Sequence, residues 1–459
     1  MKQFLLLIIF CISTFTQAQL NNRRLIVPEF GNNTVKTYVP TSATTMAVDP
    51  SFTITFNTLG GGLATTASPN CVAMYGPDLY VSLTNANQRI YKFPGYGNNP
   101  ASAILSAVQV TNLSMDYVGI AFDTAGNMYT SEGSFLNTKI VKYTAPINNA
   151  STRTILGNDG IQSYFSNITF DAAGNLWASD YRNNRLVAIP VANLNTTNTA
   201  MKSLVNASAW NATGSSLANT NVTLGAIGTN YAFTSPEGVA FDSSGGLWVA
   251  NNNDGGNVSG FINTATTLVR ISPALQAVVL SATSTIATAA LLNSTNGLKV
   301  WNLPTPAAGR PQLGGLQIDK VTDRMYVNEQ KSNSGMYFDI ASINGVTNTF
   351  ANHQLPILST SLGNGGIYLA SNTQILNTNK FENDNINISI YPNPSNGSFN
   401  ISTSENIKSA TAFDELGKKI VLETSFDNNF RMSNPKSGIY FVKVTFESGT
   451  QTTKKLVME

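Results

Sequence analysis

Residues 167–189 read NITFDAAGNLWASDYRNNRLVAI and contain three short apolar runs separated by two polar turns. The first run ends at Phe170, a glycine turn follows at residues 173–175, and the second run ends at Ala178. A second polar turn leads to the third run at residues 186–189. Short apolar and aromatic runs bounded by Gly, Asn and Asp are typical of β-strands, so the stretch predicts a three-stranded antiparallel meander.

The same pattern recurs along the chain, which indicates a repeat architecture. Complete copies occupy residues 71–93, 118–143, 167–189, 237–262 and 314–340, with partial copies at residues 23–38 and 366–377. Asp123 and Asp171 hold matching positions and are 48 residues apart. A propeller blade of four strands needs about 40 to 50 residues. Two later intervals are longer, and we expect loops around residues 195–230 and 264–305 to absorb the difference.

The partial copies at the two ends predict a closed ring. Residues 366–370 have the pattern of a first strand, and residues 25–38 have that of the next two strands. Together they would complete one blade. The predicted fold is therefore all-β, with a six-bladed β-propeller whose first blade is built from both ends. Closure removes the open sheet edges of a linear array. A seventh blade within a long insertion is the alternative, because residues 268–301 are apolar enough to form a strand pair or a short helix.

The amino-acid composition argues against certain classes of binding partner. Only 11% of the 459 residues are charged, 42% are hydrophobic, and the formal net charge is +2. So few charges provide no basic stripe for nucleic acid or for an anionic membrane surface. We therefore expect no nucleic-acid partner.

The N-terminal segment predicts a signal peptide at residues 1–18. Lys2 precedes an apolar run, and residues 16–18 offer small side chains for cleavage. The run is too short to span a bilayer, and no later stretch approaches the required length, so we expect no transmembrane segment. Cys71 is the one cysteine after this segment and opens an apolar run. We expect a buried, unreactive thiol there.

A polar residue closes the second run of most copies. The aligned residues are Glu29, Leu83, Glu132, Asp180, Asn251 and Glu329. All except the leucine could supply oxygen ligands to Ca²⁺ or another divalent cation, so these five are the candidate metal ligands. A short polar residue here also caps a hairpin turn by hydrogen bonding to nearby backbone amides. We favour this structural role and predict no catalytic residue.

Two further sets of repeated residues are interpreted as structural. The first precedes the turn after the first run and predicts Asx-type turns: Asp123, Asp171, Asp242 and Asp319. The second is aromatic and predicts packing between blades: Tyr80, Tyr129, Trp177, Trp248 and Tyr326. The single histidine, His353, lies in a predicted loop, and the chain has no Gly-x-Ser-x-Gly elbow. Histidine and serine chemistry therefore have no motif to support them.

The repeat resembles two known propeller families over about residues 20–380. The segment Asp-Tyr-Arg-Asn-Asn-Arg-Leu at residues 180–186 is similar to the NHL repeat, and residues 85–90 are a weaker copy. The copies resemble more loosely the six-bladed gluconolactonase superfamily. That second resemblance implies the alternative function, a metal-dependent lactonase-like hydrolase or lyase acting in the central channel. Propellers serve as binding platforms and as enzymes, so the resemblance leaves the function open.

The C-terminal segment resembles the sorting domain of the bacterial type IX secretion system. The matching residues are Tyr391, Pro392, Asn393, Pro394, Gly397, Gly438, Tyr440, Lys454 and Lys455. The alternating residues 438–444 predict a half-buried strand of a small Ig-like β-sandwich. The expected organisation is a signal peptide (1–18), the propeller (19–380), a polar linker (381–387) and the sorting domain (388–459).

These observations predict a secreted or outer-membrane surface protein, exported through the periplasm with the type IX secretion machinery as its partner. The leading hypothesis for the propeller is a non-catalytic binding protein for an extracellular glycan, peptide or matrix partner. The alternative is the lactonase-like enzyme.

Overall fold

The computed structural model of the chain separates into two compact units, Met1–Asn377 and Thr378–Glu459. It describes residues 23–42, 45–56, 67–85, 88–134, 137–157, 161–205, 233, 235–252, 266–283, 286–287, 297–303, 313–329, 334–340, 354–355, 365–371, 388–403, 406–414, 418–424, 428–433, 435–447 and 451–459. The predicted signal peptide and linker, together with His353, lie outside these residues.

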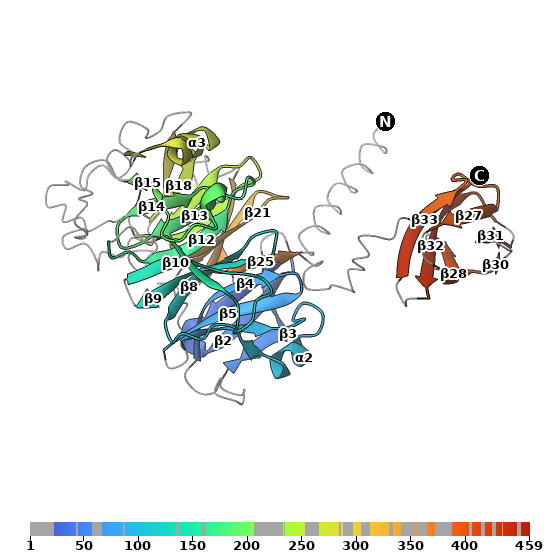
Figure 1. Cartoon of the computed structure of the whole chain (residues 1–459), viewed down its shortest axis with the longest axis horizontal. Coiled ribbons are helices and arrows are strands. Elements are labelled where there is room, and N and C mark those ends of the chain that lie inside the picture. The colour runs from blue at the N-terminus through green and yellow to red at the C-terminus, as the bar shows by residue number, and fades with distance from the viewer. Residues whose placement is uncertain are drawn as a thin grey trace. The chain divides into compact units, whose positions relative to one another are not determined.

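The described part of the first unit forms six small sheets (Figure 1). The first sheet has the order β25 (Tyr368–Ser371), β1 (Arg23–Glu29), β2 (Thr34–Pro40) and β3 (Met46–Thr55). The second contains β4 (Ala67–Tyr75), β5 (Asp78–Asn85), β6 (Arg89–Phe93) and β7 (Val108–Gln109). The third contains β8 (Asp116–Phe122), β9 (Met128–Ser134), β10 (Asn137–Tyr143) and β11 (Arg153–Gly157).

The remaining three sheets follow the same order of strands. The fourth contains β12 (Phe165–Phe170), β13 (Leu176–Asp180), β14 (Arg185–Ile189), β15 (Lys202–Val205) and β19 (Ile286–Ala287). The fifth contains β16 (Pro236–Phe241), β17 (Leu247–Asn251), β18 (Thr266–Ile271) and β20 (Leu298–Leu303). The sixth contains β21 (Leu313–Asp319), β22 (Arg324–Glu329), β23 (Ser334–Asp339) and β24 (Gln354–Leu355). The meander predicted at residues 167–189 is confirmed as the antiparallel strands β12, β13 and β14.

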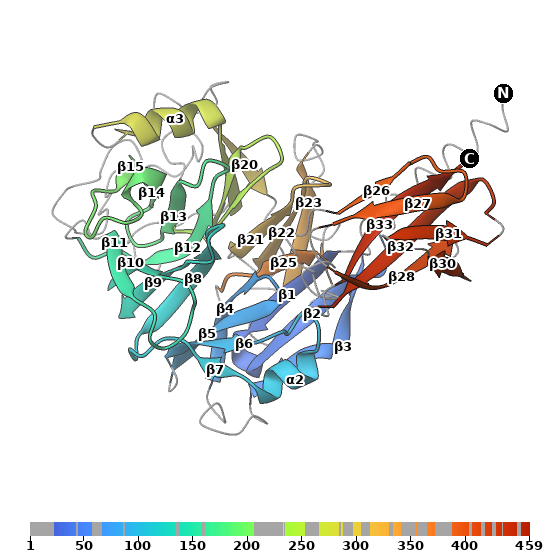
Figure 2. The same ribbon diagram turned by 45° about the vertical axis from the view of Figure 1, so that its right-hand side comes forward.

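The two ends of the repeat region meet in one sheet, as the sequence predicts. β25 pairs antiparallel with β1, and Leu25 lies opposite Leu369. The first strands also contact one another in a ring, from β4 to β8, β12, β16, β21 and β25, and β25 contacts β4. Figure 2 shows β4, β8, β12, β21 and β25 gathered at the centre, with later strands of each sheet farther out. This arrangement is β-propeller-like.

The predicted position of the third strand in the fifth repeat is wrong. Its third run was expected within residues 237–262, but the strand that pairs with β17 is β18, whose Leu268 lies opposite Ala250. Residues 264–305, expected to be a loop, supply β18, β20 and the helix α3 (Pro273–Ser281). Asn and Gly after β17 resemble a hairpin turn, so the local pattern placed the third strand too early.

The described parts of the insertions join existing sheets. β20 is the fourth strand of the fifth sheet, and β19 adds in parallel to β15. The helix α3 begins where Ser272 Oγ accepts a hydrogen bond from Leu275 N at 3.1 Å, with Pro273 in its first turn. The helix α2 (Pro100–Leu105) is capped in the same way by Asn99, and short 3₁₀ turns occur at Phe30–Asn32 and Val191–Asn193.

Neighbouring sheets pack through the aromatic residues that the repeat places in each second strand. Trp177 of β13 is fully buried in a cluster with Val239 and Phe241 of β16. Trp248 of β17 packs likewise with Leu316 of β21. The prediction of packing between sheets is therefore confirmed.

The second unit contains two four-stranded sheets around one core. One has the order β26 (Ser389–Tyr391), β27 (Ser398–Ser402), β31 (Asn429–Met432) and β30 (Leu422–Thr424). The other has the order β29 (Lys419–Ile420), β28 (Ile407–Asp414), β32 (Gly438–Phe446) and β33 (Gln451–Met458). Phe399, Phe430, Val442 and Leu456 lie in the shared core. Buried side chains alternate along β32 from Tyr440 onward, which confirms the predicted half-buried strand.

Candidate functional site

The first strands carry an irregularity at the same place. The register of strand pairing shifts between Pro69 and Cys71, Tyr117 and Ile120, Phe165 and Asn167, Pro236 and Val239, and Leu313 and Leu316. The residues at or next to these five shifts are Cys71, Gly119, Asn167, Gly238 and Gly315. Together with Gly366, which precedes β25 and lies against Cys71 and Asn167, they form what we call the bulge ring. A β-bulge bends its strand and re-aims the side chains that follow it.

Glycine permits close approach of neighbouring first strands at this ring. A Cβ atom at Gly315 would lie 2.4 Å from the carbonyl oxygen of Gly365 and 2.7 Å from the backbone nitrogen of Ile367. Across the last junction, Val72 N donates to Gly366 O at 3.1 Å. The backbones therefore come together more closely than side chains would allow.

Asn167 lies across the centre of the ring. A Cβ atom at Gly366 would lie 3.3 Å from Asn167 Nδ2 and 2.7 Å from Cys71 Sγ. Gly366 directly precedes Ile367 and β25 of the first sheet, whereas Asn167 belongs to β12 of the fourth. The Asn167 amide thus reaches a strand that is three sheets away in the ring, and it forms the floor of the cavity described next.

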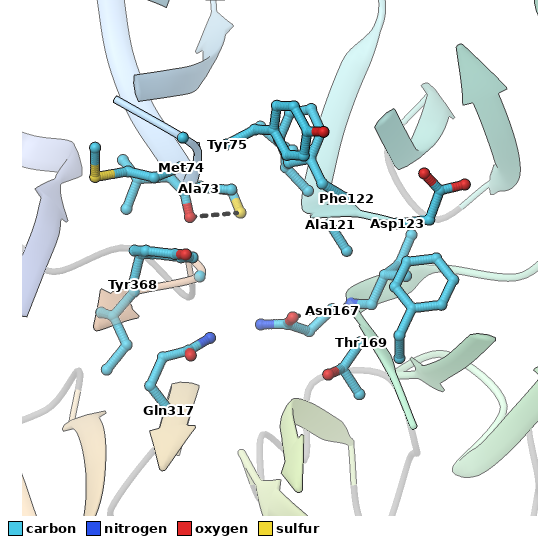
Figure 3. Close-up of a pocket in the computed structure, with 18 of the residues that line it drawn as sticks. Ala73, Met74, Tyr75, Ala121, Phe122, Asp123, Asn167, Thr169, Gln317 and Tyr368 are labelled. Atoms are coloured by element: carbon cyan, nitrogen blue, oxygen red, sulfur yellow. Dashed lines mark hydrogen bonds between the residues drawn. The ribbon is translucent and has the colours of Figure 1, made fainter. Parts of the chain in front are cut away.

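A cavity of about 470 Å³ lies on one side of the bulge ring. Its walls come from β4, β8, β12, β21 and the segment that leads into β25, at the ring residues and the positions that follow them. A volume of this size is within the usual range for small-molecule sites, about 300 to 1,000 Å³. We treat this axial cavity as the candidate functional site (Figure 3).

Amide side chains point toward the middle of the axial cavity. Figure 3 shows Asn167 and Gln317 directed toward one another from β12 and β21, with Thr169 nearby. Asn167 Oδ1 accepts a hydrogen bond from Ile168 N at 2.9 Å. Within the described residues, the Gln317 amide and the Thr169 hydroxyl have no hydrogen-bond partner. Both side chains can therefore form hydrogen bonds to a ligand, because an amide and a hydroxyl each donate and accept.

Aromatic side chains form part of the wall. Tyr75 stacks on Phe122 with ring centroids 5.2 Å apart and an angle of 26° between the rings. Tyr75 is 40% exposed, so part of its side chain remains accessible to solvent. Tyr368 lines the cavity on the side of Gln317.

The carboxylate that lines the cavity, that of Asp123, already accepts hydrogen bonds within its own turn. Oδ1 of Asp123 accepts from Ala125 N at 3.0 Å and from Asn127 N at 2.9 Å. Oδ2 accepts from Asn127 Nδ2 at 2.7 Å and from the Tyr129 hydroxyl at 3.0 Å. Asp171 and Asp242 make the same turn contacts, and Asp319 accepts from Val321 N at 3.0 Å. The prediction of Asx-type turns is confirmed.

The thiol of Cys71 also lines the cavity. It is 2% exposed, and its sulfur lies 4.0 Å from the carbonyl oxygen of Val72. Burial raises its pKa to about 12, although backbone hydrogen bonds partly oppose this shift. The thiol is therefore protonated at neutral pH. The expected burial of Cys71 is confirmed, and its low reactivity stays a prediction.

The five predicted metal ligands lie at or near the ends of the second strands and are at most 1% exposed: Glu29, Glu132, Asp180, Asn251 and Glu329. Glu29 accepts hydrogen bonds from the Thr34 hydroxyl at 2.8 Å and the Tyr38 hydroxyl at 3.0 Å. Lys36 also approaches Glu29 at 2.8 Å. These partners belong to β2, the strand that pairs with the glutamate's own strand.

Asp180 and Glu132 are likewise held within their own sheets. Asp180 Oδ2 accepts from Arg185 Nε and from Asn183 Nδ2, each at 2.8 Å. Glu132 accepts from the Tyr143 hydroxyl at 2.6 Å and pairs with Arg153. Within the described residues, no group of three or more His, Cys, Asp or Glu side chains is arranged to hold a metal ion. A metal role for the five residues stays a prediction.

A second cavity, of about 570 Å³, contains one of these five residues. It is lined by Glu132 and Arg153, and also by Asp116, Gln88 and Lys139. Burial raises the pKa of Asp116, and the hydrogen bond from Gln88, 2.8 Å long, opposes this shift. This charged cavity differs from the axial cavity, whose free polar groups are neutral.

The sorting-motif residues lie in the second unit. Asn393, flanked by Pro392 and Pro394, donates to Lys455 O and accepts from Val457 N, both at 2.9 Å. It therefore satisfies backbone groups on β33. Gly397 has φ +109°, a conformation that favours glycine, and Tyr391 is 52% exposed.

The remaining motif residues belong to the sheet that contains β33. Gly438 is the first residue of β32, and the Tyr440 hydroxyl donates to Lys436 O at 3.0 Å. Lys454 and Lys455 are exposed on β33.

The axial cavity was not predicted from the sequence. Its signal is nevertheless present, because Gly119, Gly238, Gly315 and Gly366 each precede Ile, Val or Leu at the start of a first run. A repeated glycine at one strand position indicates a bulge or a close approach of another backbone. The residues that replace glycine there, Cys71 and Asn167, both line the cavity.

Comparison with known proteins identifies the C-terminal segment. Residues 389–459 match the family model described as a secretion system C-terminal sorting domain. This match indicates export to the cell surface or the extracellular space. No curated protein matches the chain. No helix in the described residues is long and apolar enough to cross a membrane.

Solved structures similar to this chain include lyases and lactonase-like proteins. A virginiamycin B lyase from Staphylococcus aureus is 14% identical, with 85% of this chain and 94% of that chain covered and a TM-score of 0.35. A putative gluconolactonase is 10% identical, with coverage of 85% and 90% and a TM-score of 0.37. A putative 6-phosphogluconolactonase from Bacteroides uniformis is 10% identical, with coverage of 75% and 87% and a TM-score of 0.37. Likeness at this level says nothing about activity.

Proposed function

We propose that the protein is a secreted, non-catalytic binding protein whose axial cavity receives the ligand. The observation that carries this proposal is the pair of inward-facing side chains, Asn167 and Gln317, at the centre of that cavity. Gln317 has no hydrogen-bond partner among the described residues and Asn167 has only its oxygen engaged, so both amides keep groups that suit recognition of a ligand. The thiol in the cavity wall, that of Cys71, is protonated at neutral pH because burial raises its pKa to about 12.

The wider architecture is part of the same proposal. The six sheets are six blades of an NHL-like propeller, closed by the pairing of β25 with β1. A signal peptide at residues 1–18 leads the chain to the periplasm, and a linker at residues 381–387 joins the propeller to an Ig-like sorting domain at residues 388–459. The type IX secretion machinery recognises that domain and delivers the protein to the outer-membrane surface or the medium.

Binding and turnover measurements test the proposal. The full mature chain is screened against immobilised glycans and peptides, and separately against sugar lactones with product detection. We expect saturable binding to at least one compound and no turnover of any lactone. Turnover that persists in purified protein would contradict a non-catalytic role.

A metal-dependent hydrolase or lyase remains the second candidate, favoured by the charged cavity that contains Glu132 and Asp116. Ca²⁺ that binds the native state must raise its thermal stability. Melting curves with Ca²⁺ and with EDTA therefore separate the candidates. The binding proposal expects coincident curves, whereas the second candidate expects a higher melting temperature with Ca²⁺.

A further inference from the structure

We infer that the axial cavity takes an uncharged sugar residue at the end of a glycan. This inference rests on the proposed binding function and names the chemical class of the ligand. It draws on three observations: the neutrality of the free polar groups, the aromatic wall, and the floor that Asn167 makes across the axis.

The polar groups available to a ligand are amides and hydroxyls. Gln317 and Thr169 have no hydrogen-bond partner among the described residues, and Asn167 has only its oxygen engaged. An amide offers donors and an acceptor together, which matches sugar hydroxyl groups, since these also donate and accept. An anionic ligand would lose its hydration without gaining a countercharge, because the described lining residues include no lysine or arginine.

The aromatic wall suits the apolar face of a sugar ring. Tyr75 is stacked on Phe122, so its orientation is held before a ligand arrives. Aromatic side chains provide a large apolar surface, and tyrosine adds a hydroxyl at the rim. Amides on one side and an aromatic surface on another correspond to the two kinds of surface that a pyranose presents.

The floor of the cavity favours a terminal residue over a continuous chain. Asn167 reaches across the axis toward Gly366, and every lining residue lies at the bulge ring or after it. A peptide could insert only an end. Its carboxylate would meet no cationic side chain among the described lining residues, and its ammonium group could reach only Asp123, whose oxygens already accept hydrogen bonds within its own turn. A neutral glycan can insert its terminal sugar without this penalty.

Calorimetric titration of the full mature chain tests the inference. The probes are the methyl glycosides of glucose, galactose, mannose and N-acetylglucosamine, with methyl glucuronide and trialanine as charged probes. We expect at least one neutral glycoside to bind, and neither charged probe to bind as tightly. Loss of the free amide in Gln317→Ala should weaken binding about tenfold.

Matched variants assign the effect to the cavity. Gln162→Ala removes an exposed amide outside the cavity and should leave binding unchanged. Tyr75→Ala should weaken binding, whereas Tyr75→Phe should retain it because the ring remains. Gln317→Glu keeps the shape of the side chain but adds a charge, and should also weaken binding. Circular dichroism and melting curves establish that each variant is folded.

The possible results distinguish a failure of the proposed ligand class from a failure of the proposed binding function. If trialanine or the glucuronide binds more tightly than every neutral glycoside, the inference is wrong, although the binding function stands. If a glycoside binds but both Gln317 variants retain full affinity, the sugar site lies elsewhere and the inference is also wrong. If none of the six probes binds, the inference fails, while the wider screen decides the proposed function.

Discussion

Several buried carboxylates in the first unit, including Glu29, Glu132 and Asp180, are paired with cations or hydrogen-bond donors of their own sheets. Asp180 is fully buried, and its partner Arg185 is 1% exposed. Two charges at such a site are tolerated only because each neutralises the other and both are hydrogen-bonded. This local compensation explains how a chain with few charges keeps several of them inside.

We expect Asp180→Ala to destabilise the protein strongly, because Arg185 would remain buried without its partner. The free energy of unfolding should fall by about 3 to 5 kcal/mol. Asp339→Ala is the control, since Asp339 pairs with Arg324 but its side chain is 46% exposed. That change should cost at most about 1 kcal/mol. Denaturant unfolding measures both, and equal losses would contradict the buried-pair interpretation.

The Cys71 thiol should resist modification in the native protein. Burial raises its pKa from 9.0 to about 12, so the folded chain keeps a proton that the unfolded chain loses between these pH values. The thiol's contribution to stability is therefore fully present below pH 9.0 and is lost as the pH rises toward 12. We expect labelling by a thiol reagent at pH 8 to be slow until denaturant is added. Equal labelling rates in native and unfolded protein would contradict this.

At the level of elements, the first strands depend on close backbone contact at the bulge ring. Their glycines leave space for the neighbouring strand, and each strand bends where its register shifts. The aromatic residues of the second strands fill the wider space between sheets. Neighbouring sheets are therefore in close contact through their backbones near the axis and through large side chains farther out.

Gly315→Ala should be destabilising because its Cβ atom would meet backbone atoms at 2.4 and 2.7 Å. We expect a loss of about 1 to 3 kcal/mol, since backbone cannot move aside as a side chain can. Gly95→Asn is the control: Gly95 has φ +66°, a Cβ atom there would meet nothing within 4 Å, and asparagine tolerates this conformation. Thermal melting of the two variants compares them, and a neutral Gly315→Ala would show that the ring is looser than described.

For the whole molecule, the pairing of β25 with β1 closes the ring of sheets. Leu25 lies opposite Leu369, and buried Ile367 packs in a cluster with Leu25 and Val27. Without β25, the edge of β1 and the side of β4 would both lose a neighbour. Closure is therefore expected to hold the first unit together as one cooperative structure.

Two truncations test the role of closure. A chain that ends at Lys380 retains β25 and loses only the second unit, so we expect its melting temperature to match that of the full chain's first unit. A chain that ends at Asn364 lacks β25, and we expect it to lose its cooperative transition. Differential scanning calorimetry distinguishes these results, and a cooperative transition at unchanged temperature in the shorter chain would show that closure is dispensable.

Much of the architecture was predictable because strands and turns are specified by neighbouring residues. Residues 167–189 predicted three strands and their turns, and Asp171 marked a turn that the structure confirms. The fifth repeat was less predictable, because a long insertion separates β17 from β18 and no local pattern states its length. The partial copies at the two ends correctly predicted the pairing of β1 with β25.

Local sequence patterns specify the repeated strands, the turns, the sorting domain and the meeting of the two ends, because each follows from periodicity or from a continuous motif. Tertiary structure decided which of the repeated polar residues face a cavity. Asp180 was a candidate ligand, but Arg185 and Asn183 occupy its carboxylate. The local pattern predicted no role for Asn167, yet this residue extends across the axis toward Gly366 and faces Gln317. The physical reason is that the axis brings together residues from strands far apart in the chain, and no local pattern records which side chains meet there.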